Sequence, residues 1–284
     1  MKTTLLHIFR NSPMGRENLM QSAYFCKQKF GLSLAVYIPE STQFAMDFGG
    51  NPVVVHLDSS YTAYPTTARA HVEQVLAESK CTHSFYAPNE RLSGSVPLFP
   101  SDWAVIACPR VISEQSGRIG LGHIGPKVRS LVKQAPFPVF IPSMLFKPWT
   151  SVTAFFGGSK QGATAVKEGM AIARLARVPL TIHTQLGSIT KKECEKGLDA
   201  AGLTGAVSGN GAAWRVFEGG TLEENLYAVP HDSLAVCGAA GHQLISELVF
   251  GSKLEIIQAT LPNPMVIVGP NCRTPWDRLP DGGA

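Results

Sequence analysis

The chain contains the same short string twice, and this repetition constrains the fold more than any other feature of the sequence. Residues 135–141 read Ala-Pro-Phe-Pro-Val-Phe-Ile, and residues 261–267 read Leu-Pro-Asn-Pro-Met-Val-Ile. In both places a glycine, Gly125 or Gly251, stands ten residues before the string. Such an internal duplication predicts two similar units in tandem. We place one domain over residues 1–146 and a second over residues 147–284, because prolines interrupt the segment between them.

Within each half, short apolar runs alternate with segments whose apolar residues recur at helical spacing. In the first half we expect strands over residues 4–9, 32–38, 52–57, 84–87, 103–108 and 138–141, and helices over residues 17–29, 67–79 and 126–134. In the second half we expect strands over residues 151–156, 179–184, 214–217, 234–237 and 265–268, and helices over residues 162–176 and after Thr190, Thr221 and Ser252. This alternation predicts a parallel sheet covered on both faces. Because crossovers in such sheets are right-handed, each half is expected to be a doubly wound, Rossmann-like α/β domain.

Glycines between the strand at 234–237 and the helix that begins at Ser252 indicate a ligand site. They form the string G-x-x-G-x(9)-G-S, made of Gly238, Gly241, Gly251 and Ser252, and Lys253 follows. Gly238 would let a ligand approach the strand end without meeting a Cβ. Gly251 and Ser252 would offer free backbone N–H groups and the positive end of a helix to an anion, and Lys253 would add a positive charge.

The same residues also have a purely structural interpretation. Ser252-Lys-Leu-Glu255 is a capping box, so Ser252 could do no more than begin a helix. Glycines in loops between strands and helices are common because turns need them. Taken by themselves, the residues leave a phosphate site and a structural role open side by side.

The duplicated βα units, the glycine string and the closing x-Pro-x-Pro strand together resemble the universal stress protein family in its tandem, two-domain form. The resemblance is closer over residues 151–270 than over residues 2–142. It implies a five-stranded parallel sheet in each half and an adenine nucleotide, ATP or AMP with or without Mg²⁺, in the second half. Residue by residue, it implies that Gly238 and Gly241 lie against the ribose and phosphates, and that Gly251 and Ser252 hold the phosphates.

One departure from the family pattern lies at the end of the first strand of the second half. Family members that bind a nucleotide usually have an aspartate before Gly-Ser, near the adenosine, whereas this chain reads Phe156-Gly157-Gly158-Ser159. Gly157 and Gly158 stay candidate binding residues, but losing a hydrogen bond that the carboxylate accepts from the nucleoside would weaken binding by about 1–3 kcal/mol, or roughly ten- to hundred-fold. The backbone of Thr184, near the end of the second strand, is expected beside the base, in an alignment that can shift by one residue.

The first half lacks the features that would hold a phosphate. Gly125-Pro126 stands in the place of Gly251-Ser252, and proline has neither the N–H nor the hydroxyl that a phosphate would use. We therefore expect a degenerate first domain that does not bind a nucleotide in the family's manner. The two domains are expected to pair through their final strands, residues 139–141 and 265–268, in antiparallel orientation, which would bury two exposed edges.

Other motifs do not point to catalysis or to a metal site. The G-x-G-x-x-G string that ends at Gly125 does not directly follow a strand, as a dinucleotide fingerprint must. Cys237 and His242 lie beside glycines of the ligand string, and we interpret them as a packed thiol and a solvated loop residue. We therefore assign no catalytic residue and no metal ligand.

Composition narrows the class of protein further. Hydrophobic residues make up 44% of the chain and charged residues 16%, which is typical of a globular protein and not of a disordered one. No apolar run reaches the roughly 20 residues of a membrane span, and the apolar run near the N-terminus is too short for a signal peptide. The net charge of +4 is not gathered into a basic cluster, so nucleic-acid binding is not predicted. Six scattered cysteines are expected to be reduced thiols, as in cytoplasmic proteins.

These observations lead to the hypothesis of a cytoplasmic stress-response sensor. An adenine nucleotide in the second domain would change what the surface binds, with an unidentified protein as partner and a homodimer as a further level of assembly. A binding role fits better than catalysis, although slow ATP hydrolysis is compatible with the site. The alternative is a ligand-free adaptor in which both domains are structural and a protein-binding surface carries the function. The Pro- and Gly-rich tail, residues 272–284, is expected to be mobile.

Overall fold

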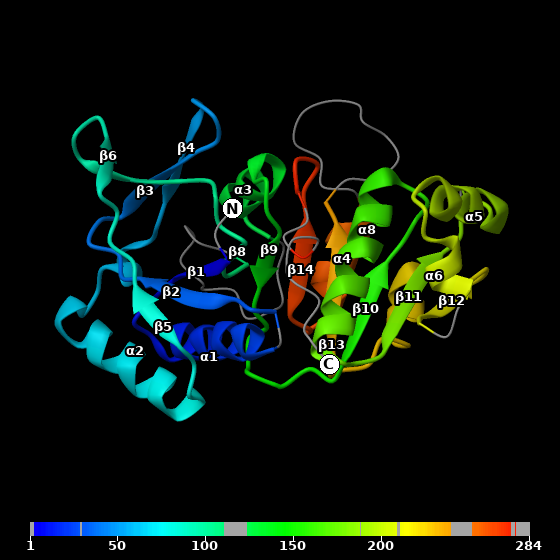
Figure 1. Ribbon diagram of the computed structural model, residues 1–284, viewed down its shortest axis with the longest axis horizontal. Coiled ribbons are helices and arrows are strands. Elements are labelled where there is room, and N and C mark those ends of the chain that lie inside the picture. The colour runs from blue at the N-terminus through cyan, green and yellow to red at the C-terminus, as the bar shows by residue number, and fades with distance from the viewer. Residues whose placement is uncertain are drawn as a thin grey trace.

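The computed structural model describes residues 3–28, 30–110, 124–187, 189–208, 211–239, 252–273 and 276. Ten strands in this part of the chain form one continuous sheet, in the order β12-β11-β10-β13-β14-β9-β8-β1-β2-β5. Four more strands form a small second sheet, in the order β4-β3-β7-β6. Figure 1 shows the first half of the chain, coloured blue to green, beside the second half, coloured green to red.

Each half contains one series of alternating strands and helices. The first half contains β1 (Thr4–Ile8), α1 (Pro13–Lys27), β2 (Ser33–Tyr37), α2 (Pro65–Ser79), β5 (His83–Phe85), β8 (Val105–Ala107), α3 (Pro126–Gln134) and β9 (Val139–Ile141). Two insertions into this half add β3 (Gln43–Asp47), β4 (Pro52–His56), the 3-10 helix η1 (Ser59–Tyr61), β6 (Glu90–Leu92) and β7 (Val96–Phe99). The second half contains β10 (Ser151–Phe155), α4 (Lys160–Ala176), β11 (Leu180–Gln185), α5 (Lys191–Ala200), α6 (Thr204–Ser208), β12 (Ala213–Phe217), α7 (Leu222–Leu226), β13 (Ser233–Gly238), α8 (Ser252–Thr260) and β14 (Met265–Val268).

Both halves arrange their five strands in the same order. The first half runs β5-β2-β1-β8-β9 and the second half β12-β11-β10-β13-β14, with neighbouring strands parallel. The halves meet where β14 pairs with β9 in antiparallel orientation, with Met265 opposite Ile141 and Ile267 opposite Val139. The doubly wound fold of each half and the pairing of the final strands are therefore confirmed. The predicted domain boundary at residue 146 falls between β9 and β10 and stays a prediction.

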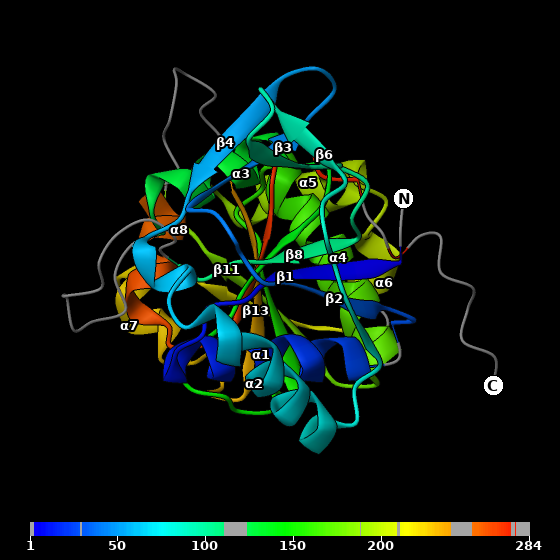
Figure 2. The ribbon, with the colours of Figure 1, turned by 90° about the vertical axis from the view of Figure 1, so that its left-hand side faces the viewer.

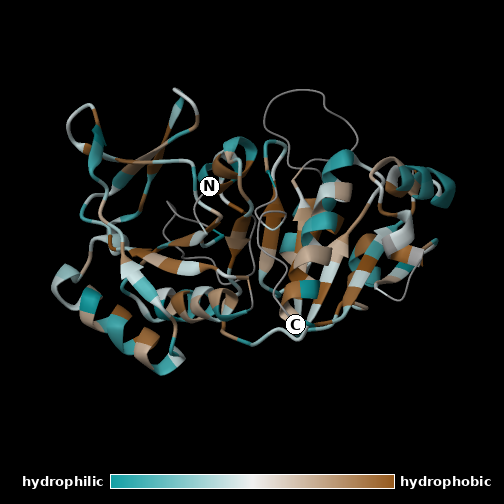
Figure 3. Cartoon of the chain, viewed as in Figure 1, coloured by the Kyte–Doolittle hydropathy of each residue, from teal (hydrophilic) through white to brown (hydrophobic). Residues whose placement is uncertain are grey.

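The main sheet is buried on both faces because its strands are apolar at nearly every position. On β9, Val139 and Ile141 pack on one face and Phe140 on the other, as the two-residue period of a strand requires. One core layer lies against α1, α2, α4 and α5, and the other lies against α3, α7, α8 and the small sheet. Figure 3 shows apolar residues gathered along the central strands.

The small sheet covers a face that helix α7 helps to cover in the second half. Phe44, Val55 and Phe99 of β3, β4 and β7 pack into the same core layer as α3. Figure 2 shows the small sheet on one side of β1, β2 and β8, and helices α1 and α2 on the other side. The strand predicted over residues 52–57 is β4, but β3, β6 and β7 were not predicted from the sequence.

Side-chain caps determine where several helices begin. The Ser12 and Ser159 hydroxyls each accept a 3.0 Å hydrogen bond from the backbone N–H of the third residue after them, at the starts of α1 and α4. The capping boxes predicted at Thr190 and Thr221 are both present. Among the described residues, no helix combines the length and apolar character that a membrane span requires.

The end of the chain returns to the first half. The backbone N–H of Arg273 donates to the Pro136 carbonyl oxygen at 2.8 Å. Trp276 is only 1% exposed and packs against Phe30, with ring centroids 5.1 Å apart. The expectation of a mobile tail is therefore wrong for these residues, because a large aromatic side chain anchors this segment in the core.

Candidate functional site

The carboxyl ends of β10 and β13 lie side by side in the middle of the second half's sheet. From there β10 leads into α4 on one face, and β13 leads toward α8 on the other face. In doubly wound sheets, ligands bind in the crevice outside the strand ends at such a switch point. The described candidate residues come to this edge from the β10–α4 turn, the ends of β11 and β13, and the first turn of α8.

The turn from β10 into α4 contains two residues without side chains, Gly157 and Gly158. Gly158 adopts a φ of +78°, a conformation that favours glycine, and Ser159 then caps α4. Helix α5 packs closely on this turn, since a Cβ on Gly197 would lie 3.1 Å from the Gly158 carbonyl oxygen. A Cβ on Gly157 would meet much more open space, with Lys253 Nζ at 4.0 Å as its nearest described neighbour.

Lys253 reaches from α8 across the end of β10 to the end of β11. Its Nζ donates a 3.1 Å hydrogen bond to the backbone oxygen of Gln185, the last residue of β11. Lys253 is exposed, so its ammonium group lies at the solvent side of the strand ends. The Gln185 side chain is engaged elsewhere, because its Oε1 accepts a 2.6 Å hydrogen bond from Asn225. The structure thus brings Lys253, Gly157 and Gln185 together.

Gly238 ends β13, and the packing of α4 accounts for the glycine there. A Cβ at this position would lie 2.8 Å from both the carbonyl carbon and the carbonyl oxygen of Gln161, in the first turn of α4. Backbone atoms cannot move aside as the end of a flexible side chain can. The close approach of α4 is therefore sufficient to require glycine at 238, whether or not a ligand is bound.

Thr184 lies inside β11, one residue before the end of the strand. Its side chain is fully buried, and its Oγ1 accepts a 2.9 Å hydrogen bond from the indole nitrogen of Trp214. Its neighbour Gln185 is the residue whose backbone faces Lys253. The one-residue shift allowed for in the sequence alignment therefore matters, because the backbone oxygen that Lys253 contacts belongs to Gln185. The predicted position of the Thr184 backbone beside the base stays a prediction.

Part of the predicted ligand string lies outside the described residues. This applies to Gly241, Gly251 and His242, and to the side chain of Ser252. The backbone of Ser252 is described and begins α8. Their predicted contacts with ribose and phosphate stay predictions.

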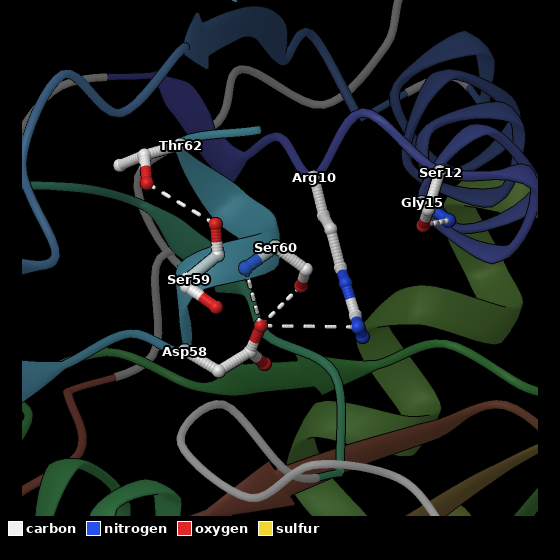
Figure 4. Close-up of polar contacts among 7 residues, drawn as sticks. All are labelled: Arg10, Ser12, Gly15, Asp58, Ser59, Ser60 and Thr62. Carbon is white, nitrogen blue, oxygen red and sulfur yellow. Dashed lines mark hydrogen bonds and ion pairs between the residues drawn. The ribbon is translucent and has the colours of Figure 1, made fainter. Parts of the chain in front are cut away.

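In the first half the position that corresponds to Gly157 is occupied by Arg10. The turns Phe9-Arg10-Asn11-Ser12 and Phe156-Gly157-Gly158-Ser159 have the same length and end on the same kind of serine cap. The Arg10 guanidinium lies 3.8 Å from an Asp58 carboxylate oxygen and 5.6 Å from the centre of the Tyr61 ring. Figure 4 shows Arg10 and Asp58 facing each other.

Sequence reasoning missed this pair of residues. The shared Phe-x-x-Ser spacing could have found Arg10, because it aligns the ends of the first strands of the two halves. Asp58 could not have been found in that way, since the inserted strands β3 and β4 bring it back to the end of β1.

No protein-family model and no curated protein matches the chain, but solved structures do. A universal stress protein from Archaeoglobus fulgidus matches 94% of this chain and 98% of its own, with a TM-score of 0.62 and 13% identity. A putative universal stress protein from Pseudomonas aeruginosa matches 95% of this chain and 94% of its own, with a TM-score of 0.56 and 14% identity. The chain has the tandem universal stress protein fold.

The same comparison shows that this fold occurs in another setting. The cytoplasmic domain of a prokaryotic cation chloride cotransporter matches 98% of this chain and 100% of its own, with a TM-score of 0.52 and 11% identity. At such identities the likeness concerns the fold alone. A function therefore has to be argued from the residues of the site.

Within the universal stress protein fold, the far end of α8 is held by the first half. Arg110 donates hydrogen bonds to the backbone oxygens of Gln258 and Leu261, the second at 3.0 Å. A positive charge is favourable at the carbonyl end of a helix. Arg129 of α3 forms a 2.8 Å ion pair with Glu255, the last residue of the predicted capping box. The helix that carries Lys253 is thus fixed to the neighbouring half.

Burial shifts the pKa of two side chains on the strands of the site. Cys237, beside Gly238, is 1% exposed, and burial raises the pKa of its thiol. The thiol is therefore protonated at neutral pH and is not a reactive thiolate. Burial lowers the pKa of His183 to about 4, so this imidazole is neutral between the rings of Phe155 and Phe217.

Proposed function

We propose that the chain is a regulator that binds an adenine nucleotide at the switch point of its second half. The observation that carries the proposal is the meeting of a residue without a side chain, Gly157, with the Lys253 ammonium group, which is hydrogen-bonded to the backbone of Gln185. The turn there carries no side chain that would fill the site. A positively charged group lies at its edge, as a phosphate-bearing ligand would require.

Helix α8 supplies the second element of the proposed site. The helix begins at Ser252, and the first N–H groups of a helix, together with its dipole, favour an anion. The predicted contacts of Gly241, Gly251 and Ser252 belong to this proposal, and so does Mg²⁺ when the ligand is ATP. Gly238 gives little support, because the packing of α4 already explains it.

The groups that meet at this point favour binding over catalysis. Among the described residues they are glycines, one ammonium group and a backbone carbonyl. The ammonium group can bind a phosphate, and none of these described groups is a general base toward water at neutral pH. A regulatory role would follow from α8, since a ligand at its first turn would stabilise a helix whose other end is bound by Arg110 of the first half. Under this proposal the first half is a scaffold and the response reaches a protein partner in the cytoplasm.

The direct test is to measure nucleotide binding to the full chain and to place a side chain at position 157. Native mass spectrometry and calorimetry with ATP, ADP and AMP are expected to show one nucleotide per chain. Gly157→Leu should abolish binding, because the new side chain would occupy the place beside Lys253, where the nearest described atom to an added Cβ is Lys253 Nζ at 4.0 Å. Circular dichroism would show that the variant is folded. The matched control is Gly205→Leu on the exposed helix α6, where an added Cβ contacts nothing within 4 Å. It should bind as the parent does.

Two outcomes would contradict the proposal. Binding that survives Gly157→Leu would place the ligand elsewhere, and two equivalent nucleotides per chain would contradict the scaffold role of the first half.

Thermal unfolding gives a second test, since a nucleotide at 100 times its Kd should stabilise the fold by about 2.7 kcal/mol. If thermal unfolding shows no such change with any nucleotide, the ligand-free adaptor becomes the better hypothesis. The same native spectra would test the predicted homodimer.

A further inference from the structure

The two halves each place a positively charged group over the end of their first strand. In the first half this group is the guanidinium of Arg10, two residues before the helix cap Ser12. In the second half the matching position is Gly157, two residues before Ser159, and the charge comes from Lys253. Each half therefore has a positively charged group near the end of its first strand, although different elements supply it.

In the first half, this charge has an anionic partner within the chain. A carboxylate oxygen of Asp58 lies 3.8 Å from the Arg10 guanidinium, and only 9% of the Asp58 side chain is exposed. The same Asp58 oxygen accepts hydrogen bonds from the backbone N–H of Ser60, at 2.8 Å, and from the Ser60 hydroxyl. The 3-10 helix η1 thus holds a carboxylate against Arg10 (Figure 4).

In the second half, the described residues provide Lys253 with a neutral partner. Its hydrogen bond goes to the Gln185 carbonyl oxygen. No carboxylate of the described residues forms an ion pair with it. The short connection from β11 to α5 has no counterpart of η1, and the described residues there bring no acid to the strand end.

The chemistry of a nucleoside suggests which anion completes this arrangement. A carboxylate beside the sugar accepts hydrogen bonds from ribose hydroxyls, whereas a cationic side chain accommodates a phosphate on that sugar. Resting on the proposed function, we infer that the second half binds an adenine nucleotide that carries a phosphate on its ribose ring as well as at its 5′ position. Lys253 binds the ring phosphate over the end of β10, in the role that Asp58 plays toward Arg10.

The test compares three ligands by calorimetry on the full chain: AMP, adenosine 2′,5′-bisphosphate and adenosine 3′,5′-bisphosphate. One of the bisphosphates should bind about tenfold more tightly than AMP, as one charge-assisted hydrogen bond would give. Lys253→Met should remove this difference, so that the bisphosphate and AMP bind with equal affinity when both are measured on that variant. Lys167→Met, at an exposed lysine of α4, is the matched control and should keep the difference.

Gly157→Asp separates this inference from the family-based expectation. If the missing acid weakens binding, restoring it should strengthen the binding of AMP. If Lys253 binds a ring phosphate, the carboxylate introduced at position 157 should form an ion pair with Lys253 and reduce the affinity for the bisphosphate about tenfold or more. Circular dichroism would show that the variants are folded.

The outcomes also separate the inference from the proposed function. AMP or ATP binding with no gain from a ring phosphate would overturn the inference and leave the proposed function standing. An unchanged ligand preference in Lys253→Met would likewise overturn it. If no nucleotide binds at all, the proposed function fails and the inference fails with it.

Discussion

The two halves share a strand order but differ at the carboxyl ends of their central strands. In the first half, Arg10 faces Asp58, and the buried ring of Tyr61 packs beside them. In the second half, Gly157 has no side chain at the corresponding position, and Lys253 Nζ is the nearest described atom to a Cβ placed there. The difference teaches that one copy of a duplicated domain can pair the cation at its strand end with a carboxylate of the same chain, while the other copy keeps its cation exposed to solvent.

The insertion explains how the first half reaches this state. Residues 38–64 join β2 to α2 and contain β3, β4 and η1, whereas only residues 186–190 join β11 to α5. The long connection adds apolar residues to one core layer and also carries Asp58 to Arg10. The same insertion thus supports the scaffold role of the first half in two ways.

The halves should differ most in the free energy of unfolding that an alanine costs at the third residue after each serine cap, Gly15 in the first half and Gly162 in the second. A Cβ on Gly15 would lie 1.8 Å from the backbone oxygen of Arg10, whereas a Cβ on Gly162 would lie 3.2 Å from the ring of Phe156. Gly15→Ala should therefore destabilise the fold by about 3 kcal/mol or more, because backbone has to move. Gly162→Ala should cost about 1 kcal/mol or less, since helix propensity favours alanine.

Urea unfolding of both variants would check this comparison. Equal shifts of the two unfolding midpoints would break it, because they would mean that the turn in the first half is as adaptable as the turn in the second. A large loss for Gly15→Ala alone would confirm that Arg10 is held in place by its backbone as well as by Asp58.

Much of the architecture could be predicted from local sequence patterns. Apolar runs and capping boxes depend on neighbouring residues, so the strand at 265–268 and the helix starts at Thr190, Thr221 and Ser252 agree with the structure. The repeated x-Pro-x-Pro string also marked the final strand of each unit, and the structure shows that these two strands join the halves.

The features that could not be predicted depend on contacts between distant residues. Residues 90–99 form β6 and β7 although they contain Ser, Gly and Pro, since β7 pairs with β3 and β6 pairs with β7. The Arg10–Asp58 pair needs the fold of the insertion. Gly238 was interpreted through a ligand, yet a neighbouring helix turn accounts for it, and no pattern within one segment distinguishes these causes.

Each half buries one histidine on a strand of the main sheet, His7 in the first half and His183 in the second. Burial lowers the pKa of His7 to about 3 and that of His183 to about 4, so both are neutral in the folded chain. In the unfolded chain a histidine takes up a proton below about pH 6.5. Stability should therefore fall as the pH falls from 6.5 toward 4, by about 2 kcal/mol per histidine at pH 5.

Variants at these two positions would separate the contributions of the halves. His183→Phe keeps an aromatic ring between Phe155 and Phe217, and His7→Gln can keep a hydrogen bond to Ser22. Each variant should lose about 2 kcal/mol less than the parent when unfolding at pH 7.5 is compared with unfolding at pH 5. A pH slope unchanged in His7→Gln would show that His7 is protonated in the folded state.

The smallest expected effect comes from the ends of α2 and α5, which occupy corresponding places in the two halves. The chain leaves α2 through Lys80, with φ of +52°, and leaves α5 through Gly202, with φ of +70°. A left-handed conformation costs a non-glycine residue about 1–2 kcal/mol, whereas glycine adopts it without a steric penalty. Lys80→Gly should therefore stabilise the first half by up to about 1 kcal/mol, after the greater flexibility of glycine in the unfolded chain is subtracted. The reverse change, Gly202→Lys, should destabilise the second half by a similar amount. An added Cβ there meets no described atom within 4 Å, so backbone strain is the main effect.

Thermal unfolding of both single variants and of the double variant would measure these two changes in stability. The two changes should nearly cancel in the double variant, since the residues lie in different halves and distant sites contribute additively. Destabilisation by Lys80→Gly would instead mean that the lysine side chain makes a contribution at the end of α2 that outweighs its strained backbone.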